Sequence, residues 1–503
     1  MEILRLAVQT IMKIAIIGGG ISGCAIYLAL KKRLPQPPAP ADEHQYTIFE
    51  AYDTQRNRPA QITPGEAHSA TLVVGGGIGL HPNGVRSLQR LNEDLARDVQ
   101  RAGHLFKEQR FISAYGWMLA RMPCEFSGIQ SISLSRHALW NCLRSYVPDD
   151  VIVTKRVSQV IANANGRSVV KFADGTSDVE ADLIIGADGL RSPTRRALFP
   201  DASEDLYPPI FRQVIRPPSR LCRFLIEPMI LLSGLVGVGG VMQSDEFKTF
   251  IEPSTMNFIF GGNGFCGYSF VQSPEVSPER PSTMQAGDTA SDNTIMWWST
   301  YQMDSCPDPK SVDKEAILRD LHTRLDSWKD PAIKKILSMA QIQTIFPQNS
   351  TPELPTWSRD GVILIGDAAH TLTPTSGQGT CQALEDVECF SMLFAHLLKQ
   401  IYNTSKNISL CDIATVEKEA IAQTMAKHME IRQPRVRAIQ ERAKGFDNNK
   451  KNISKVAEFI MYLALFIMGK LPTPAWLTQL WAYDIADEVN NEIQKMGAKN
   501  PEV

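Results

Sequence analysis

The sequence predicts an α/β protein made of a Rossmann-like domain, a second region built on a β-sheet, and a C-terminal helical region. Three observations predict this fold class. Residues 13–17 are a short β-type run that enters a glycine-rich turn, and an apolar helical pattern follows. Residues 203–345 are richer in proline, glycine and aromatic residues. From residue 383 onward, apolar residues recur at helical spacing. Because 503 residues exceed what one core usually organises, we expect two packed regions.

The first domain can be justified element by element. The strand at 13–17 leads through "GGGISG" into a helix, and a proline-rich loop, 35–45, precedes a second strand that ends in Glu50. Residues 157–189 contain Asn-Gly and Asp-Gly hairpin signals, which predict a β-meander followed by a buried strand that ends at "GADG". The predicted division is 1–202 (first domain, first part), 203–345 (second region), 346–400 (first domain, second part) and 401–503 (C-terminal helical region).

The second region contains the strand-like segments "FIFGGNGFCGYSF" (258–270) and "MWWSTY" (296–301). Their aromatic side chains either line a pocket or fill the core. Two apolar stretches, 228–242 and 459–468, fall short of the roughly 20 residues that span a membrane. We interpret 459–468 as a buried helix rather than a monotopic membrane contact, because its polar flank is not a basic face.

Composition and charge indicate a small-molecule ligand. The chain has 43% apolar and 21% charged residues, and its net charge of −2 argues against nucleic acid or an acidic membrane held by bulk electrostatics. The nine cysteines are odd in number and scattered, without a C-x-x-C pair, which indicates a reducing, cytoplasmic location and no metal site. The opening "MEILRLAVQTI" lacks the features of a secretory signal.

The pattern G-x-G-x-x-G at Gly18, Gly20 and Gly23 lies between a strand and a helix. The first glycine permits a tight turn, the second lets a diphosphate approach the backbone, and the third lets helix and strand pack closely. Glu50, at the end of the second strand, is placed to bind ribose hydroxyls. The alternative is an ordinary structural turn. Since the chain has one such fingerprint, a nicotinamide cofactor would visit the protein rather than reside in it.

Three stretches together resemble the fingerprints of single-component FAD-dependent monooxygenases, the group A aromatic hydroxylases that include hydroxybenzoate and salicylate hydroxylases. They are "GGGISG" with Glu50, "GADGLRSPTR" (186–195) and "GDAAHTLTPTSGQG" (366–379). Residues 203–340 look, more loosely, like the fungal secondary-metabolite branch. The resemblance implies an FAD-binding domain of the hydroxybenzoate-hydroxylase type, non-covalent FAD, and NADPH or NADH as a transient co-substrate.

The resemblance also implies the roles of individual residues. Asp367 would bind the ribityl chain, Asp188 would lie near the pyrophosphate, and Arg136 would reach the phosphates or the ribityl chain. Pro374, beside the reacting edge of the flavin, and Arg191 are the catalytic candidates. The residues assigned to FAD are Gly18, Gly20, Ser22, Gly23, Glu50, Gly76, Arg136, Asp188, Asp367, Gly377, Gly379 and Thr380.

Several of these residues also have an alternative, purely structural interpretation. Asp367 could cap a helix, and Arg136 could form a surface ion pair. Arg195 is either a structural or a phosphate-facing cation. His370 is interpreted as a packed or hydrogen-bonded histidine more readily than as a general base.

The expected reaction is hydroxylation or epoxidation, through a flavin C4a-hydroperoxide, of an aromatic, phenolic, indole-type, alkaloid or terpenoid small molecule, with O2 as oxidant. The alternatives are a flavin amine oxidase producing peroxide, a Baeyer–Villiger enzyme, or a flavoprotein without enzymatic activity. The second of these needs another nucleotide fingerprint, which the sequence lacks. The substrate, NADPH versus NADH, and monomer versus homodimer stay open.

Overall fold

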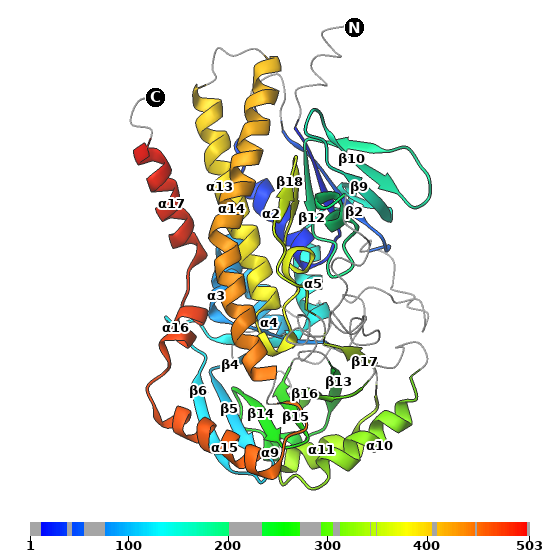
Figure 1. The fold of residues 1–503 in the computed structure, drawn as a ribbon, viewed down its shortest axis with the longest axis vertical. Coiled ribbons are helices and arrows are strands. Elements are labelled where there is room, and N and C mark those ends of the chain that lie inside the picture. The colour runs from blue at the N-terminus through cyan, green and yellow to red at the C-terminus, as the bar shows by residue number, and fades with distance from the viewer. Residues whose placement is uncertain are drawn as a thin grey trace, which may run out of the picture.

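Two sheets organise the molecule, one above the other in the view of Figure 1, with long helices beside the upper sheet. The computed structural model describes residues 12–37, 43–54, 76–200, 234–271, 293–304, 312–342, 344–348, 350–404, 410–447 and 450–499. The start of the chain and the first part of the apolar stretch 228–242 lie outside the described residues.

The upper sheet has six strands, and neighbouring strands are parallel except for the β18–β19 pair. In order across the sheet they are β18 (Ser358–Arg359), β19 (Val362–Leu364), β12 (Leu183–Gly186), β1 (Lys13–Ile17), β2 (Gln45–Glu50) and β8 (Ile152–Thr154). Ile17 is opposite Gly186, and Gly186 is opposite Leu364. The carboxyl ends of three strands therefore meet at one edge, as the predicted Rossmann-like fold requires.

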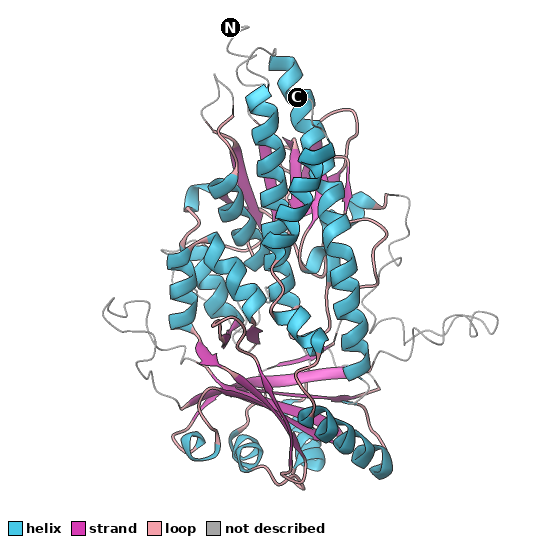
Figure 2. Ribbon diagram, turned by 90° about the vertical axis from the view of Figure 1, so that its left-hand side faces the viewer, coloured by secondary structure: helices cyan, strands magenta, loops and turns pink. Residues whose placement is uncertain are grey.

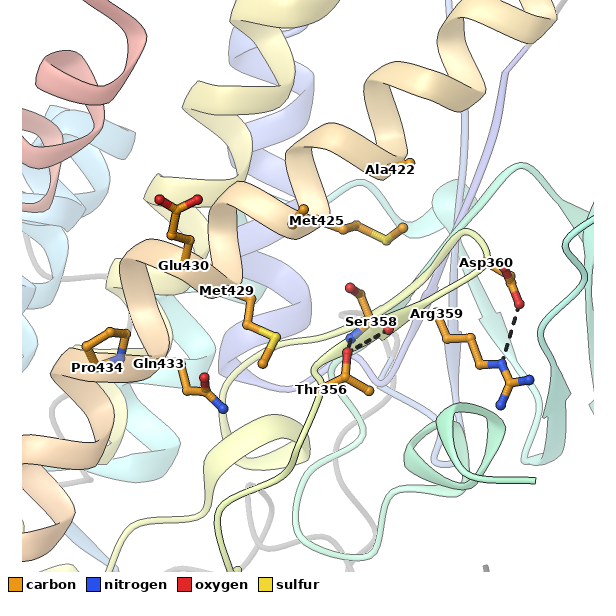
Figure 3. A pocket seen from close by; sticks show the side chains of 11 residues that line it. Thr356, Ser358, Arg359, Asp360, Ala422, Met425, Met429, Glu430, Gln433 and Pro434 are labelled. Carbon is orange, nitrogen blue, oxygen red and sulfur yellow. Dashed lines mark hydrogen bonds and ion pairs between the residues drawn. The ribbon is translucent and has the colours of Figure 1, made fainter. Parts of the chain in front are cut away.

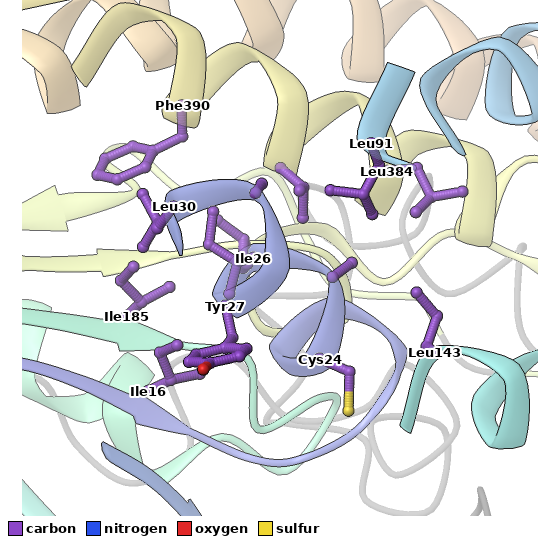
Figure 4. Packing of buried hydrophobic residues seen from close by; sticks show 14 of the residues in the cluster. Ile16, Cys24, Ile26, Tyr27, Leu30, Leu91, Leu143, Ile185, Leu384 and Phe390 are labelled. Carbon is purple, nitrogen blue, oxygen red and sulfur yellow. The ribbon is translucent and has the colours of Figure 1, made fainter. Parts of the chain in front are cut away.

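Helices cover this sheet and extend beyond it. They include α2 (Ile21–Arg33), α3 (Pro82–Leu91), α4 (Glu93–Ala102), α5 (Arg136–Ser145), α13 (Gly379–Thr404) and α14 (Leu410–Asp447). Figure 4 shows α2 between the sheet and α13, where Ile26 and Leu30 lie between Ile185 and Phe390. All four side chains are fully buried. Burial of this apolar face fixes α2, and with it the turn that precedes the helix.

Two small antiparallel sheets complete the upper half. One contains β9 (Val157–Ile161), β10 (Ser168–Phe172) and β11 (Val179–Ala181). The other contains β3 (Gly77–Leu80), β7 (Ser131–Ser135) and β4 (His104–Phe106). The turns of the first sheet contain Gly166 and Gly175, and Gly175 has a positive φ of 71° that a glycine adopts without strain. The second sheet brings residue 77 next to Ser135, at the start of α5.

The lower sheet has seven strands, in the order β17-β13-β16-β15-β14-β5-β6. Their bounds are β17 (Thr344–Pro347), β13 (Leu235–Gln243), β16 (Thr294–Gln302), β15 (Gly264–Phe270), β14 (Thr255–Gly261), β5 (Glu108–Ser113) and β6 (Met118–Pro123). Two of these strands precede residue 203, and β5 pairs in parallel with β14. The sheet is therefore assembled from two distant parts of the chain. Figure 2 shows helices below it, on the side away from the upper sheet.

The two faces of this sheet have different partners. Trp297 is buried in a core cluster with α10 (Lys314–Leu325) and α11 (Pro331–Met339). Met296 and Trp298, its neighbours in β16, point to the opposite face and pack in the cluster shared with the upper half. Trp297 is thus ordinary core, whereas Trp298 lies on the face toward the first domain.

The C-terminal region contains α15 (Lys455–Lys470), α16 (Ala475–Trp481) and α17 (Ile485–Lys499). The prediction of a helix over 459–468 is confirmed, but its burial is wrong. Only Met461, Tyr462 and Leu465 turn inward among its apolar residues, because α15 lies against the edge strand β6 and contacts the protein along one side. In the described residues no single helix is long and apolar enough to cross a membrane; α15 and α16, bent by 76°, reach that length and composition only as a pair.

Candidate active site

The turn after β1 has the geometry that a close-approach loop needs. Gly18 has a φ of +100°, and a Cβ on it would lie 2.6 Å from the Ala187 oxygen. A Cβ on Gly23 would lie 1.8 Å from the Gly18 oxygen. Gly20 is the N-cap of α2 and no side chain caps this helix. The positive end of α2 is therefore left for a ligand with negative charge.

Glu50 lies at the end of β2 beside this turn. Its carboxylate accepts hydrogen bonds from the backbone nitrogens of Gly19, at 2.7 Å, and Tyr52, at 3.1 Å. Burial raises the pKa of Glu50, although these backbone hydrogen bonds act in the opposite direction. The indole nitrogen of Trp140, on α5, donates to the Gly19 oxygen at 2.9 Å. Both contacts hold the first turn in place, and the ribose-binding role of Glu50 stays a prediction.

The second turn, after β12, is tied to the third by Arg195. The guanidinium donates to the carbonyl oxygens of Leu190 at 2.9 Å, Ala368 at 2.7 Å and Asp367 at 3.0 Å. Arg195 is buried, so these contacts support the structural interpretation of this cation. Arg191, by contrast, is exposed in the turn before α6 (Pro193–Leu198).

Asp188 also stabilises the second turn, through hydrogen bonds to the start of α6. Its Oδ2 accepts hydrogen bonds from the Thr194 nitrogen at 3.0 Å and the Thr194 hydroxyl at 2.7 Å. Burial raises the pKa of Asp188, and the hydrogen bonds from Ser192 and Thr194 oppose that rise. The carboxylate thus anchors the start of α6; its predicted contact with the pyrophosphate stays a proposal.

The third turn follows β19 and begins at Gly366, which has a φ of +57°. A Cβ on Gly366 would lie 2.6 Å from the Ser22 hydroxyl, so the first and third turns are in contact. Asp367 opens the short helix α12 (Asp367–His370), whose N-cap is Gly366 and which receives no side-chain cap. The helix-cap interpretation of Asp367 is therefore not supported, and its carboxylate stays partly exposed.

Arg136 faces Asp367 from α5. Its guanidinium lies 3.6 Å from Asp367 Oδ2, and its backbone nitrogen donates to the Gly76 oxygen at 2.8 Å. The ion pair of the structural interpretation is therefore present. However, the buried Nε of Arg136 has no hydrogen-bond acceptor among the described residues. An unmatched buried donor costs roughly 1–3 kcal/mol, which a phosphate or ribityl oxygen would recover.

The chain then forms a 3₁₀ turn, Pro374–Ser376, and enters α13. The Gly377 nitrogen donates to the Pro374 oxygen at 3.0 Å, and Gly377 has a left-handed φ of +60° that favours glycine. A Cβ on Gly379 would meet nothing within 4 Å, so the space before α13 is open. Gly379 and Thr380 form the first turn of α13, whose positive end points into this space.

Glu385 and Asp386, inside α13, belong to a buried polar network that local patterns did not reveal. Asp386 Oδ2 accepts from the Gly366 nitrogen at 2.8 Å and from His370 Nε2 at 2.6 Å, and Asp386 Oδ1 accepts from Arg432 Nε at 2.9 Å. Burial alone would raise the pKa of Asp386, but His370 and Arg432 hold it well below its usual value. His370 is thus the packed, hydrogen-bonded histidine that was expected.

The carboxylate of Glu385, next to Asp386 in α13, stabilises the turn before this helix through Asn83. Asn83 donates to Gln378 Oε1 at 2.9 Å and to Glu385 Oε1 at 2.7 Å, and Arg435 also donates to Glu385. Burial works against ionisation of Glu385, yet Arg435 and Arg432 keep its pKa below the usual value. Two adjacent acids inside an apolar helical run are the sequence signal that could have identified this network.

Lys450 is a second group that sequence reasoning missed. It is buried, its Nζ donates to the Thr375 hydroxyl at 2.8 Å, and it lies 4.5 Å from the centre of the Phe265 ring. Thr375 also binds the carboxylate of Asp447. Burial lowers the pKa of Lys450 to about 8, and Asp447 partly opposes that change. A cation therefore lies between the residue after Pro374 and the aromatic face of the lower sheet.

On that face the ring of Phe258 contacts those of Phe111, Phe265 and Trp298, with centroid separations from 5.5 to 6.0 Å. Met296 extends the aromatic face toward the upper half, because a Cβ on residue 77 would lie 1.9 Å from the Met296 sulfur.

The surface pocket of about 660 Å³ drawn in Figure 3 lies away from this face. It lies between α14 and the β18–β19 turn, and no predicted site residue lines it.

The structure thus defines a class: an α/β protein with a dinucleotide-binding turn at one sheet edge and an aromatic face beside it. Three features suit the binding of FAD: the glycine turn, the uncapped N-terminus of α2 and the Arg136 Nε without an acceptor among the described residues.

The model of the FAD binding domain family matches residues 236–428. Salicylate hydroxylase of Pseudomonas putida is 23% identical over 378 residues, which are 75% of this chain and 74% of that protein.

A relative from Hypocrea jecorina, the FAD-dependent monooxygenase sor5, is 24% identical and covers 97% of this chain and 95% of its own. Among solved structures, CtdE in complex with FAD and a substrate has a TM-score of 0.65 at 15% identity, covering 98% and 100% of the two chains. A salicylate hydroxylase substrate complex has a TM-score of 0.62 at 17% identity, covering 96% and 98%. By these matches the chain is similar to FAD-dependent monooxygenases, salicylate hydroxylases among them, and its fold is that of the solved members. The amine oxidase alternative is not favoured.

Proposed function

We propose that this monooxygenase inserts one oxygen atom from O2 into a small phenolic or related aromatic molecule, with NADPH or NADH as a visiting reductant. The observation that carries the proposal is the meeting of three turns at one sheet edge opposite an aromatic face. Reduced FAD, when bound, supplies the activation of O2. The protein supplies binding, orientation and exclusion of water.

The cofactor would be held by groups from all three turns. The backbone of residues 18–20 and the end of α2 would receive the diphosphate, and Glu50 would face the ribose. Asp367 and Arg136 would bind the ribityl chain and phosphates, with Asp188 near the pyrophosphate. With these contacts the flavin ring system would lie near the start of α13, whose positive end would stabilise negative charge on it.

The catalytic roles are assigned on the same basis. The Pro374 carbonyl, which accepts one hydrogen bond from Gly377, has a second lone pair that could receive a substrate hydroxyl. Lys450 favours substrates that carry a hydroxyl or a negative charge over neutral indoles or alkenes. Arg191 lies exposed at the rim, where we propose that it meets the visiting nicotinamide cofactor or the substrate.

The test uses the full chain purified with FAD. Phenols, aromatic acids and indoles are supplied with NADPH or NADH, and we measure cofactor oxidation, O2 uptake and product mass. The proposal requires an aromatic compound that stimulates cofactor oxidation and gains one oxygen atom. Substrate-dependent peroxide release without oxygenation would support the oxidase alternative, and absence of any stimulated turnover would support a non-enzymatic flavoprotein.

Three further features remain proposals. A cytoplasmic location is supported by the unpaired, mostly buried cysteines among the described residues. A place in secondary-metabolite biosynthesis is supported by relatives named FAD-dependent monooxygenase penM and ptmM, from Penicillium species, at 23% and 24% identity. Sedimentation of the FAD-loaded protein would decide between monomer and homodimer.

A further inference from the structure

The helix α15 presents a continuous apolar surface to solvent. Its exposed large side chains, together with that of the residue after it, are between 45% and 71% exposed. We call this set the α15 face: Val456, Phe459, Ile460, Leu463, Phe466, Ile467 and Leu471. Between Lys455 and Lys470 every exposed residue is apolar. A monomeric soluble protein rarely leaves a row of this extent uncovered.

The face cannot be hidden by rotating the helix, because polar contacts fix its inner side. The Tyr462 hydroxyl lies 2.8 Å from the Phe260 oxygen and 2.7 Å from Glu458 Oε1, to which its one hydrogen can be donated, and it accepts from the Ala114 nitrogen at 3.3 Å. Farther along, Gly469 packs so closely on β6 that a Cβ there would lie 2.7 Å from the side chain of Ala120. The outward orientation is therefore built into the fold.

The exposed charged residues at the ends of the face are lysines. Lys455 and Lys470 mark its two ends and both are exposed. The one acid of this helix, Glu458, is 1% exposed and already paired with Lys455 at 2.8 Å. Trp117, 51% exposed, adjoins the face, with its ring centre 6.1 Å from that of Phe459. An apolar row with lysines at its ends and a neighbouring tryptophan is the pattern of a helix that lies in a membrane interface.

We propose that the α15 face binds the surface of a lipid bilayer containing anionic lipids, with the helix lying in the interface plane rather than crossing it. A second copy of the chain fits less well. Two such helices laid side by side would bring lysine against lysine in the parallel arrangement, and Lys455 against Lys470 in the antiparallel one. Anionic headgroups complement the exposed Lys470 and, more weakly, Lys455, whose charge Glu458 offsets.

The test is flotation of the full FAD-loaded chain with vesicles of phosphatidylcholine alone or mixed with phosphatidylglycerol. We expect binding that is stronger with phosphatidylglycerol and weakened by salt. The double variant Ile460→Glu, Leu463→Glu should bind about tenfold or more weakly, since each buried apolar side chain contributes roughly 1.5–3 kcal/mol. Lys470→Gln should reduce the preference for phosphatidylglycerol.

The matched control is Ile161→Glu, Met339→Glu, which places the same charges on exposed apolar residues outside the face. It should bind vesicles like the unaltered chain, and the flavin absorbance of all variants should show that they are folded. Equal binding by the Ile460→Glu, Leu463→Glu variant and the unaltered chain overturns the proposal, as does absence of vesicle binding. A dimer in ultracentrifugation that this variant dissociates, without vesicle binding, assigns the face to a second copy instead.

Discussion

Asp386 Oδ2 lies 2.8 Å from the backbone nitrogen of Gly366, so a carboxylate inside α13 holds the peptide group between Ile365 and Gly366, at the start of the third turn. The same carboxylate is charge-paired with Arg432 of α14. The position of the third turn thus depends on the packing of two long helices.

Asp386→Asn tests this dependence. Breaking this buried ion pair leaves Arg432 with Glu385 as its remaining carboxylate partner and leaves His370 without its charged acceptor, which should lower the free energy of unfolding by about 3–5 kcal/mol. FAD should bind about fivefold more weakly, because weakening the hydrogen bond that positions Gly366 costs roughly 1 kcal/mol. Denaturant unfolding and FAD titration measure the two effects. The control Glu315→Gln, at an exposed ion pair with Arg319, should change stability by less than about 1 kcal/mol.

Gly23→Ala tests the close packing of the first turn. The added Cβ would lie 1.8 Å from the Gly18 oxygen, so the turn must move. We expect loss of FAD binding and a lower thermal midpoint. Gly445→Ala is the matched control: this residue lies inside α14 with open space around it, and alanine there should stabilise the helix by about 1 kcal/mol. A Gly23→Ala protein that retains FAD would contradict the assignment.

Asp367→Ala separates cofactor binding from folding. The carboxylate is partly exposed and its ion pair with Arg136 is long, at 3.6 Å, so the FAD-free protein should keep its thermal midpoint within a few degrees. FAD affinity should fall by about tenfold or more if the side chain binds the ribityl hydroxyls, since hydrogen bonds to charged groups contribute roughly 1.5–3 kcal/mol. An unchanged FAD affinity would leave Asp367 with the ion pair alone.

Lys450 should introduce a pH dependence near its pKa of about 8. Below that pH the side chain is charged and can hold a phenol oxygen; above it the charge is lost, so KM for a phenolic substrate should rise with pH. Lys450→Met should raise KM at pH 7 and remove this step, whereas Lys450→Arg should keep the low KM at higher pH. A pH profile of KM for the three proteins checks this, and identical profiles would exclude substrate contact.

Glu417 should make stability fall with pH between about 4.5 and 7. It is buried, its Oε1 accepts from the Tyr402 hydroxyl at 2.5 Å, and burial raises its pKa to about 7. In that range the unfolded chain loses the proton that the folded chain keeps, so the contribution present below the unfolded pKa is lost as pH rises. Glu417→Gln should flatten the unfolding free energy across this window relative to the unaltered protein.

The parts of the fold that local sequence determines were predictable. The strand, glycine turn and helix at residues 13–30 depend on neighbouring residues, and the structure has them in the expected order. The strand before "GADG" was likewise expected, and β12 ends at Gly186 as that prediction requires. The FAD-binding character of the fold was recognisable for the same reason.

The parts that depend on distant pairings were not predictable. Nothing in residues 108–113 indicates that they pair with β14, and nothing near Lys450 indicates that its amine reaches Thr375. The exposure of α15 was missed because hydropathy reports how apolar a helix is, not which neighbour covers it. Buried Arg432 looked like one charge among many on a helix, since its partners lie 46 and 47 residues earlier.

The pairing of β5 with β14 has a consequence for how such proteins can be recombined. A segment such as 234–347 cannot be exchanged with a relative as a self-contained unit. The edge strand of the transplanted segment, β14, would still have to match β5, whose paired residues lie 147 positions earlier in the chain, as Glu108 does from Thr255. Chimeras that move both pieces together keep the hydrogen-bonded edge complementary. Those that move one piece expose a strand that is free to aggregate.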